Sequence, residues 1–139
     1  MNEQHRIVSV LLPVYNAGGY LKDSVMSILQ QTYKSFELLI LDDGSTDGCT
    51  AFLKDINDNR IRLIKRNHNY ISTLNYGLSI ARGQYIARMD ADDKMFPTRL
   101  AEQVNVLNEN PDVVICCSYM PAGSNVCVMM FLSVKVSKI

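Results

Sequence analysis

The amino-acid sequence predicts an α/β fold, in which helices cover both faces of a mostly parallel sheet. Short apolar runs rich in β-branched residues alternate with segments whose apolar residues recur at helical spacing. This alternation is typical of strand–helix–strand units, whose right-handed crossovers place successive strands parallel to one another. A chain of 139 residues can bury a core without disulfides or structural metals. We therefore expect one domain built as a three-layer α/β/α sandwich.

Five short apolar runs are the expected strands. The first two are apolar at nearly every position, as in strands that are buried on both faces of a parallel sheet. The expected strands cover residues 7–13, 36–41, 61–64, 85–89 and 113–117.

The segments between these strands are expected to be helical, because their apolar residues fall on one helical face and turn or capping residues bound them. Glycine suits the residue just after a helix, and proline stops one. The expected helices are one with Leu21, Val25, Ile28 and Leu29 on one face; one from the turn 42–47 to about Asn57; one through Leu74, Leu78 and Ala81 that ends at Gly83; and one from Pro97 through Leu100, Val104 and Leu107 to Asn110.

The composition excludes several classes of partner. Fourteen basic and fourteen acidic side chains cancel, so no overall field attracts nucleic acid or an anionic membrane. The cysteines, at positions 49, 116, 117 and 127, lack zinc-ligand spacing and are expected to be reduced thiols. Residues 1–13 lack a signal-peptide cleavage site, and the apolar stretch 126–134 is too short to cross a bilayer. We expect a cytoplasmic protein without a transmembrane segment.

Polar residues with unusual chemistry follow three of the expected strands, at 13–16 (PVYN), 42–45 (DDGS) and 90–93 (DADD). Open α/β sheets bind ligands beyond the carboxyl ends of their strands. The topology should therefore gather these three segments along one edge of the sheet.

Asp90, Asp92 and Asp93 place three carboxylates within four residues. Such carboxylates repel one another unless a cation or several donors compensate them. Mg²⁺ or Mn²⁺ is a natural partner, since these ions take one or two protein carboxylates and complete their shell with water and substrate phosphates. A solvated acidic turn that caps the next helix is the alternative, and the spacing alone does not decide between the two.

Asp43 stands at the mouth of a buried strand, where its carboxylate could accept the ring N–H of a pyrimidine. Tyr15 could stack on the same base, which contributes about 1–3 kcal/mol per base in nucleic-acid binders. Asp47 or Thr46 is expected only to cap the following helix. Arg88 could balance the charge of the acidic cluster or touch a phosphate, whereas His68, in a polar loop, is expected to be exposed and to have no role as base or ligand.

These strand ends, in this order, resemble glycosyltransferase family 2, whose members have the GT-A fold. The resemblance covers residues 7–117. The segments that carry it are VSVLLPVYNAGGYLKDSVMSILQQTYKSFELLILDDGSTDGC and NYGLSIARGQYIARMDADDKMFPTRLAEQV. Each motif is short, and their joint occurrence in register makes the resemblance specific.

The resemblance implies a sugar-nucleotide donor, usually a UDP-sugar but GDP- or TDP-linked in some members, and transfer to an acceptor hydroxyl with inversion. By similarity, Pro13, Tyr15 and Asn16 would line the nucleoside site and Asp43 would bind the base. Asp90 and Asp92 match the DxD motif of the family, which implies that Asp92 ligates Mn²⁺ or Mg²⁺ and that Asp90 lies nearer the ribose. The metal would neutralise charge on the departing nucleoside diphosphate.

The resemblance ends near Ser118. Family members continue well beyond this length, and the carboxylate base that deprotonates the acceptor lies in that later part. The tail after Ser118 contains no acidic residue. We therefore expect residues 1–117 to form an incomplete donor-binding domain and 118–139 an atypical tail, as in a truncated or frame-altered gene product. Such a chain should bind donor and metal but transfer sugar weakly or not at all.

Further expectations concern the tail and the setting of the activity. The tail should either add a makeshift strand or leave apolar surface that promotes self-association. The resemblance also implies a role in polysaccharide or glycoconjugate synthesis. A protein without membrane spans could carry out this role while resting on the inner membrane face through partners.

Alternative functions follow from the same sequence features. One is a non-catalytic nucleotide-binding or interaction module. A second is a phospho-acceptor receiver domain, although the acidic pair of a receiver usually follows the first strand. A dinucleotide-binding domain is disfavoured, because Gly18-Gly19 does not extend to GxGxxG.

Overall fold

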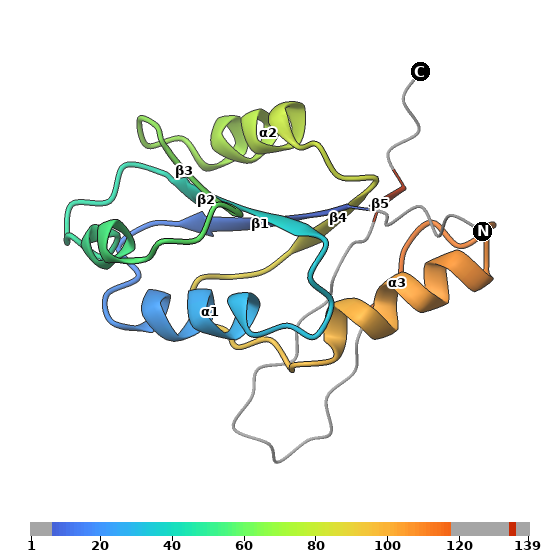
Figure 1. Cartoon of the computed structure of the whole chain (residues 1–139). Helices are drawn as coiled ribbons and strands as arrows, with labels where there is room; N and C mark the ends of the chain where they lie inside the picture. Colours follow the sequence, from blue (N-terminus) through green and yellow to red (C-terminus); the bar gives the residue numbers. More distant parts are fainter. Residues whose placement is uncertain (1–6, 118–133, 136–139) are drawn as a thin grey trace, which may run out of the picture.

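A twisted sheet forms the centre of the protein (Figure 1). The computed structural model describes residues 7–117 and 134–135. Its sheet has five strands in the order β3-β2-β1-β4-β5, of which the first four are parallel and β5 is antiparallel to β4. The strands are β1 (Val8–Val14), β2 (Phe36–Asp42), β3 (Ile61–Lys65), β4 (Tyr85–Arg88) and β5 (Val134–Lys135). The four parallel strands confirm the expected runs 7–13, 36–41, 61–64 and 85–89 to within one residue at either end.

Helices cover both faces of the sheet, as the sequence predicts. Figure 1 shows α1 and α3 on one face and α2 on the other. The helical segments are α1 (Tyr20–Leu29), the 3-10 helix η1 (Ala51–Asp55), α2 (Tyr70–Ile80) and α3 (Arg99–Glu109). The three-layer α/β/α arrangement is therefore confirmed.

The core consists of two hydrophobic layers, one on each side of the sheet. Every residue of β1 and β2 is buried, because alternate side chains enter opposite layers and both layers are covered. Val10 and Ile40 belong to the layer under α1 and α3, whereas Leu11 and Leu39 belong to the layer under α2. This double burial explains why the two strands lack the polar–apolar alternation of a half-exposed strand.

One buried polar network ties the amino ends of the strands together. The Glu37 carboxylate accepts hydrogen bonds from Ser9 Oγ (2.6 Å), the Arg82 main-chain N–H (2.7 Å) and the Arg62 guanidinium (3.0 Å). The Ser9 hydroxyl in turn accepts from the Gly83 main-chain N–H at 2.8 Å. Burial would raise the pKa of Glu37, but the bonds from Ser9, Arg82 and Arg62 outweigh it and hold that pKa below its ordinary value.

The expected strand at 113–117 is wrong. Those residues follow the turn at Pro111 and Asp112 without strand pairing, and Val114 and Ile115 are exposed. Val113 and Cys116 still pack against the core, so the apolar run serves as covering rather than as a strand. The edge of β4 is paired instead by Val134 and Lys135, which agrees with the expectation that the tail adds a makeshift strand. Residues 118–133 and 136–139 lie outside the described residues.

Two expected helix boundaries are also wrong. The helix expected to reach Asn57 is only the 3-10 helix η1. Helix α2 ends at Ile80, and Ala81 at its end is extended, so Gly83 is not its cap. A Cβ atom at Gly83 would lie 2.4 Å from the main-chain nitrogen of Ser9, so glycine is needed there for close packing.

Two further findings concern the cysteines and the helices of the described residues. Cys49, Cys116 and Cys117 are free thiols, and Cys127 lies outside the described part of the chain. Within the described ranges, none of the helices has both the length and the apolarity that a bilayer crossing requires.

We predict that Glu37→Gln lowers the free energy of unfolding at pH 7 by about 1.5–3 kcal/mol, the usual size of hydrogen bonds to a charged group. Because the pKa of Glu37 is lowered by folding, its contribution is present at neutral pH and is lost as pH falls through the folded-state pKa. The difference between variant and wild type should therefore shrink in acid. Urea denaturation from pH 7 to pH 3 measures it.

Asp112→Asn is the control, because this exposed carboxylate has no hydrogen bond or ion pair to another described residue. It should leave stability unchanged. Equal stability of Glu37→Gln and wild type at pH 7 would contradict the role assigned to the network.

Candidate functional site

The loops after β1 and β2 are joined by hydrogen bonds at the carboxyl edge of the sheet. The Asn16 main-chain N–H donates to Ser45 Oγ at 3.0 Å, and the Asn16 side-chain oxygen accepts from the Thr46 N–H at 2.7 Å. The Gly18 N–H donates to Asp47 Oδ2 at 2.9 Å. Asn16 has φ of 48°, a left-handed conformation that asparagine tolerates better than most residues. The expected meeting of the first two strand ends is thus confirmed.

Asp47 does not cap a helix, contrary to expectation. Its second oxygen accepts from the Cys49 N–H at 3.0 Å, and the residue at the start of η1 is Thr50, whose side chain makes no capping bond. Because no α-helix follows this turn, Asp47 has no helix N-terminus to satisfy. It holds the two loops together instead.

The third strand end joins the other two at a pocket of about 450 Å³. Ala91 and Asp92, from the loop after β4, line this pocket together with the segment that follows β1. The lining residues are Pro13, Tyr15, Asn16, Ala17, Gly18, Tyr20, Ala91 and Asp92. Four of the residues singled out from the sequence, Pro13, Tyr15, Asn16 and Asp92, therefore line one pocket.

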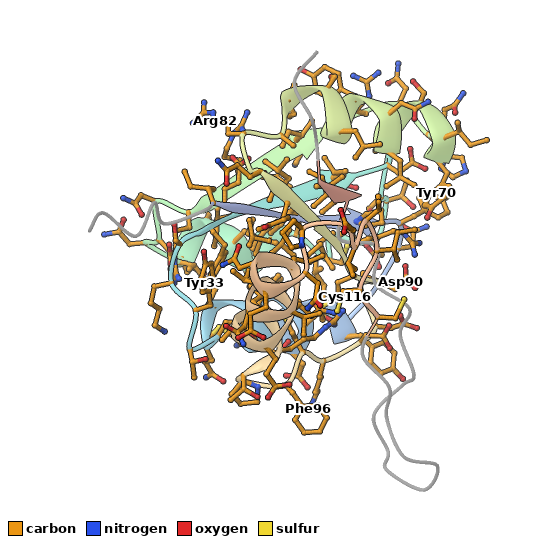
Figure 2. All side chains as sticks on the ribbon, turned by 90° about the vertical axis from the view of Figure 1, so that its right-hand side faces the viewer. Tyr33, Tyr70, Arg82, Asp90, Phe96 and Cys116 are labelled. Atoms are coloured by element: carbon orange, nitrogen blue, oxygen red, sulfur yellow. The ribbon has the colours of Figure 1, made fainter. Side chains whose placement is uncertain are left out.

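The clustered carboxylates have different surroundings. Asp90 Oδ1 lies 2.7 Å from the Arg88 guanidinium, which also donates to the Tyr70 hydroxyl at 2.6 Å, so Arg88 balances the acidic cluster. Figure 2 shows Tyr70 and Asp90 on the same side of the molecule. Asp93 is buried. Burial lowers the pKa of Arg99 to about 9, against the opposing effect of the Asp93 charge.

Asp92 is the exposed carboxylate of the cluster, and it makes no hydrogen bond or ion pair with another described residue. Across the described residues, His, Cys, Asp and Glu side chains form no group of three that could enclose a metal. Mg²⁺ and Mn²⁺ are commonly held by one or two carboxylates and completed by water and phosphates. The residues present, Asp92 with half-exposed Asp90 beside it, fit a metal of that kind.

Asp43 lies deep at the end of β2, with a side chain that is 1% exposed. Its Oδ1 accepts hydrogen bonds from the Asn69 N–H (2.8 Å) and the Thr73 hydroxyl (2.6 Å), which tie β2 to the first turn of α2. Its Oδ2 is equally buried, and no described donor meets it with hydrogen-bond geometry. Burial would raise the pKa of Asp43, but the bonds from Thr73 and Asn69 and the nearby His68 hold it below its ordinary value.

His68 belongs to this site, although no role there was expected from the sequence. Its side chain is 60% exposed, as expected. Its ring, however, stacks on the Tyr15 ring with centroids 4.1 Å apart and planes inclined by 26°. Its Nδ1 lies 3.1 Å from the Asp43 main-chain oxygen and 2.9 Å from Asp43 Oδ2. The feature of the sequence that could have identified His68 is its position just beyond the carboxyl end of β3, another parallel strand.

Gly44 permits this close approach. It has φ of +84°, and a Cβ atom there would lie 3.1 Å from the main-chain nitrogen of His68. The loop after β3 can therefore lie directly against the loop after β2.

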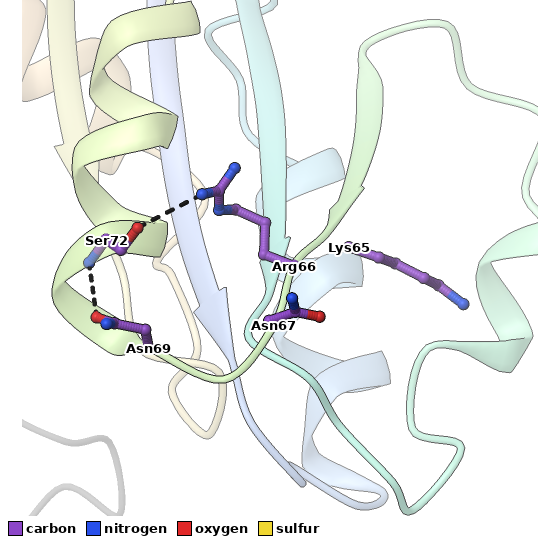
Figure 3. A pocket seen from close by; sticks show the side chains of 5 residues that line it. All are labelled: Lys65, Arg66, Asn67, Asn69 and Ser72. Carbon is purple, nitrogen blue, oxygen red and sulfur yellow. Dashed lines mark hydrogen bonds between the residues drawn. The ribbon is translucent and has the colours of Figure 1, made fainter.

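A second pocket, of about 480 Å³, lies between the end of β3 and the start of α2 (Figure 3). Its lining residues are Lys65, Arg66, Asn67, Asn69 and Ser72. Asn69 caps α2 by accepting from the Ser72 N–H at 3.1 Å, and the Arg66 guanidinium lies over the Tyr76 ring, 4.3 Å from its centroid. Arg66 and Asn69 thus already have structural partners, and none of the site residues predicted from the sequence lines this pocket.

Solved structures with this fold are GT-A glycosyltransferases. TarS 1-349 of S. aureus, in complex with UDP-GlcNAc, matches with a TM-score of 0.74 and 23% sequence identity over 86% of this chain and 36% of that one. The mannosyltransferase PcManGT from Pyrobaculum calidifontis, in complex with GDP-Man and Mn²⁺, matches with a TM-score of 0.72 and 27% identity over 84% of this chain and 36% of that one. The protein has the GT-A fold.

The sequence identifies the family. The family model described as glycosyl transferase family 2 matches residues 9–128. The glycosyltransferase GlyG of Streptococcus pneumoniae is 40% identical over 119 residues, which cover 78% of this chain and 38% of GlyG. The chain belongs to glycosyl transferase family 2. It spans about a fifth to two fifths of the length of the curated relatives that it matches.

We predict that Thr73→Val lowers the free energy of unfolding by about 1–3 kcal/mol, because it leaves a buried carboxylate oxygen with one donor fewer. Loss of that bond also raises the folded-state pKa of Asp43. The stability that the lowered pKa provides is present at neutral pH and lost as pH falls through the folded-state pKa, so acid unfolding should begin at higher pH in the variant. Denaturation across pH 3–7 measures both effects.

Thr73→Ser is the matched control, since it keeps the hydroxyl that bonds Asp43. It should retain most of the wild-type stability and acid resistance. If Thr73→Val and Thr73→Ser behaved alike, the bond to Asp43 would not be what stabilises this edge.

Proposed function

We propose that the chain binds the donor of a sugar transfer, a nucleotide-diphosphate sugar, together with a divalent metal ion. The observation that carries this proposal is the pocket that Pro13, Tyr15, Asn16 and Asp92 line together. An aromatic ring and a carboxylate without a described partner that line one pocket suit the two ends of such a donor, the base and the diphosphate with its metal. The ligands of TarS and PcManGT, UDP-GlcNAc and GDP-Man with Mn²⁺, support the same class of donor.

On this proposal each predicted residue has a distinct task. Tyr15, about half exposed, stacks on the base, while Pro13 and Asn16 line the nucleoside site. Asp43 accepts a ring N–H of the base through its buried Oδ2, which no described donor meets with hydrogen-bond geometry. Asp92 ligates Mn²⁺ or Mg²⁺, and Asp90, held by Arg88, lies towards the ribose. A metal held by Asp92 would supply Lewis-acid chemistry there, since it would neutralise negative charge on the leaving diphosphate.

The identity of the base rests on what Asp43 can accept. A uracil ring offers one N–H between two carbonyl groups, which suits a single carboxylate oxygen. Thymine offers the same N–H, and guanine offers a ring N–H and an exocyclic amino group, so TDP- and GDP-sugars are the other candidates. We propose a UDP-sugar as the donor.

Transfer is proposed to be weak or absent in this chain on its own. No acidic residue follows Ser118 in the sequence, so the tail supplies no carboxylate to deprotonate an acceptor hydroxyl. The acceptor is proposed to be a hydroxyl group of a growing polysaccharide or glycoconjugate. The cytoplasm, where thiols such as Cys49 stay reduced, is the proposed compartment.

Asp92→Ala should abolish the metal dependence of nucleotide binding. Calorimetric titration of UDP and then GDP, with and without Mn²⁺, measures the effect on wild type and variant. Asp112→Asn, which removes a carboxylate far along the chain after α3, is the control and should bind like wild type. Metal-dependent binding that survived in Asp92→Ala would show that another group holds the ion.

The purified chain should release little UDP from UDP-GlcNAc in the presence of Mn²⁺ and candidate hydroxyl acceptors, with no multiple turnover. A time course of UDP release, at enzyme and donor concentrations set by the calorimetry, measures this directly. Efficient multiple-turnover transfer that disappears in Asp92→Ala would contradict the proposed lack of a base while supporting the donor site.

A further inference from the structure

The His68 imidazole makes the two contacts that the proposed function gives to the nucleotide base. One face of its ring stacks on Tyr15, with centroids 4.1 Å apart. Its Nδ1 lies 2.9 Å from Asp43 Oδ2 and 3.1 Å from the Asp43 main-chain oxygen. An ionised carboxylate and a carbonyl group are acceptors only, so Nδ1 is the ring nitrogen assigned the proton. A flat aromatic ring with an N–H beside Asp43 thus already occupies the base position.

Asp43 Oδ2 cannot receive a base while His68 stays in place. This oxygen is buried, and the side chain as a whole is 1% exposed. No described donor bonds it with good geometry, although buried polar atoms are almost always hydrogen-bonded. The oxygen therefore lacks a well-aligned donor, and the His68 imidazole lies directly against it, with Nδ1 at 2.9 Å.

The side chain of His68, and not its loop, is the part that can move. Its main chain packs against Gly44, and the next residue, Asn69, donates its N–H to Asp43 Oδ1 at 2.8 Å. The imidazole is 60% exposed and can turn outward by rotation about its own side-chain bonds. Such a rotation would uncover both Tyr15 and Oδ2 without disturbing the sheet or α2.

We propose that the His68 ring occupies the place of the base in the free protein. The ring must rotate away from Tyr15 before a nucleotide can bind. This inference rests on the proposed function, since it assumes that Tyr15 and Asp43 receive the base. His68 then lowers the affinity for every nucleotide, because part of the binding free energy is used to displace it. In this role it is a specificity-determining residue, since it favours bases that can replace both of its contacts.

The opposite arrangement is a sandwich, in which the base lies between His68 and other residues and the imidazole contributes to binding. The two arrangements predict opposite effects of removing the ring. They also differ in whether the contact between His68 and Tyr15 survives in the complex. Both differences can be measured on the intact chain.

The test is calorimetric titration of UDP and GDP with Mn²⁺ into wild type and His68→Ala. If the swung-out conformer makes up about a tenth of the free protein, His68→Ala should bind about ten-fold more tightly. His5→Ala, the same substitution at the other histidine of the chain, is the matched control and should leave affinity unchanged. Unchanged or weaker binding by His68→Ala would overturn the inference.

Nuclear Overhauser contacts between the rings of His68 and Tyr15 give a second readout. They should be present in the free protein and lost when the wild-type chain is saturated with nucleotide. Contacts that persist at saturation would overturn the inference and leave the proposed function standing. Failure of wild type and His68→Ala alike to bind either nucleotide would overturn the proposed function, and the inference with it.

Discussion

The parallel pairing of β1 with its two neighbours determines where all of the polar strand ends lie. On one side Val14 is opposite Asp42, so the loops that follow β1 and β2 start level with each other. On the other side Arg88, the last residue of β4, is opposite Leu11, so β4 ends earlier along the sheet. The residues that follow β4 therefore continue along the sheet towards the end of β1. As a result, Ala91 and Asp92 reach the pocket beside Pro13 and Tyr15.

The same edge concentrates carboxylates in a protein with no net charge, and the structure stabilises most of them individually. Asp42 accepts from the Ser45 N–H at 2.9 Å, and Asp43 is held by the first turn of α2. Asp90 is paired with Arg88, and the charge of buried Asp93 acts on Arg99. Asp92 remains without a described partner and faces the pocket. This difference in partners distinguishes the carboxylate that can bind a ligand from those that maintain the fold.

The elements that could be predicted from the sequence are those with a local or strongly periodic cause. Strands β1 and β2 are buried on both faces, which leaves a nearly continuous apolar run, and α3 has both a clear apolar face and a proline after its end. The pocket residues were predictable because parallel strands put their carboxyl ends on one edge. Pro13, Tyr15, Asn16 and Asp92 meet there for that reason.

The errors have long-range causes. Residues 113–117 are apolar enough for a strand. However, the edge of β4 with which they could pair is occupied by residues 134–135. Gly83 follows a helix at a distance that suits a C-cap, yet glycine is needed there because the main chain of Ser9, on a strand far away in sequence, lies so close. His68 stands in a polar loop with no motif of its own, and its contacts with Tyr15 and Asp43 exist because Gly44 lets two loops touch. Contacts of this kind leave no periodic signal in the sequence.

The central claim is that the pocket between the ends of β1 and β4 holds a metal-bound nucleoside diphosphate. Paramagnetic broadening of backbone amide signals by Mn²⁺, added at low concentration in the presence of UDP, locates such a complex without any need for turnover. The account predicts that the signals of Asn16, Gly18 and Asp92 broaden first, while those of η1 remain sharp. Broadening centred on the residues around Lys65 and Ser72, or spread evenly over the exposed carboxylates, would contradict it.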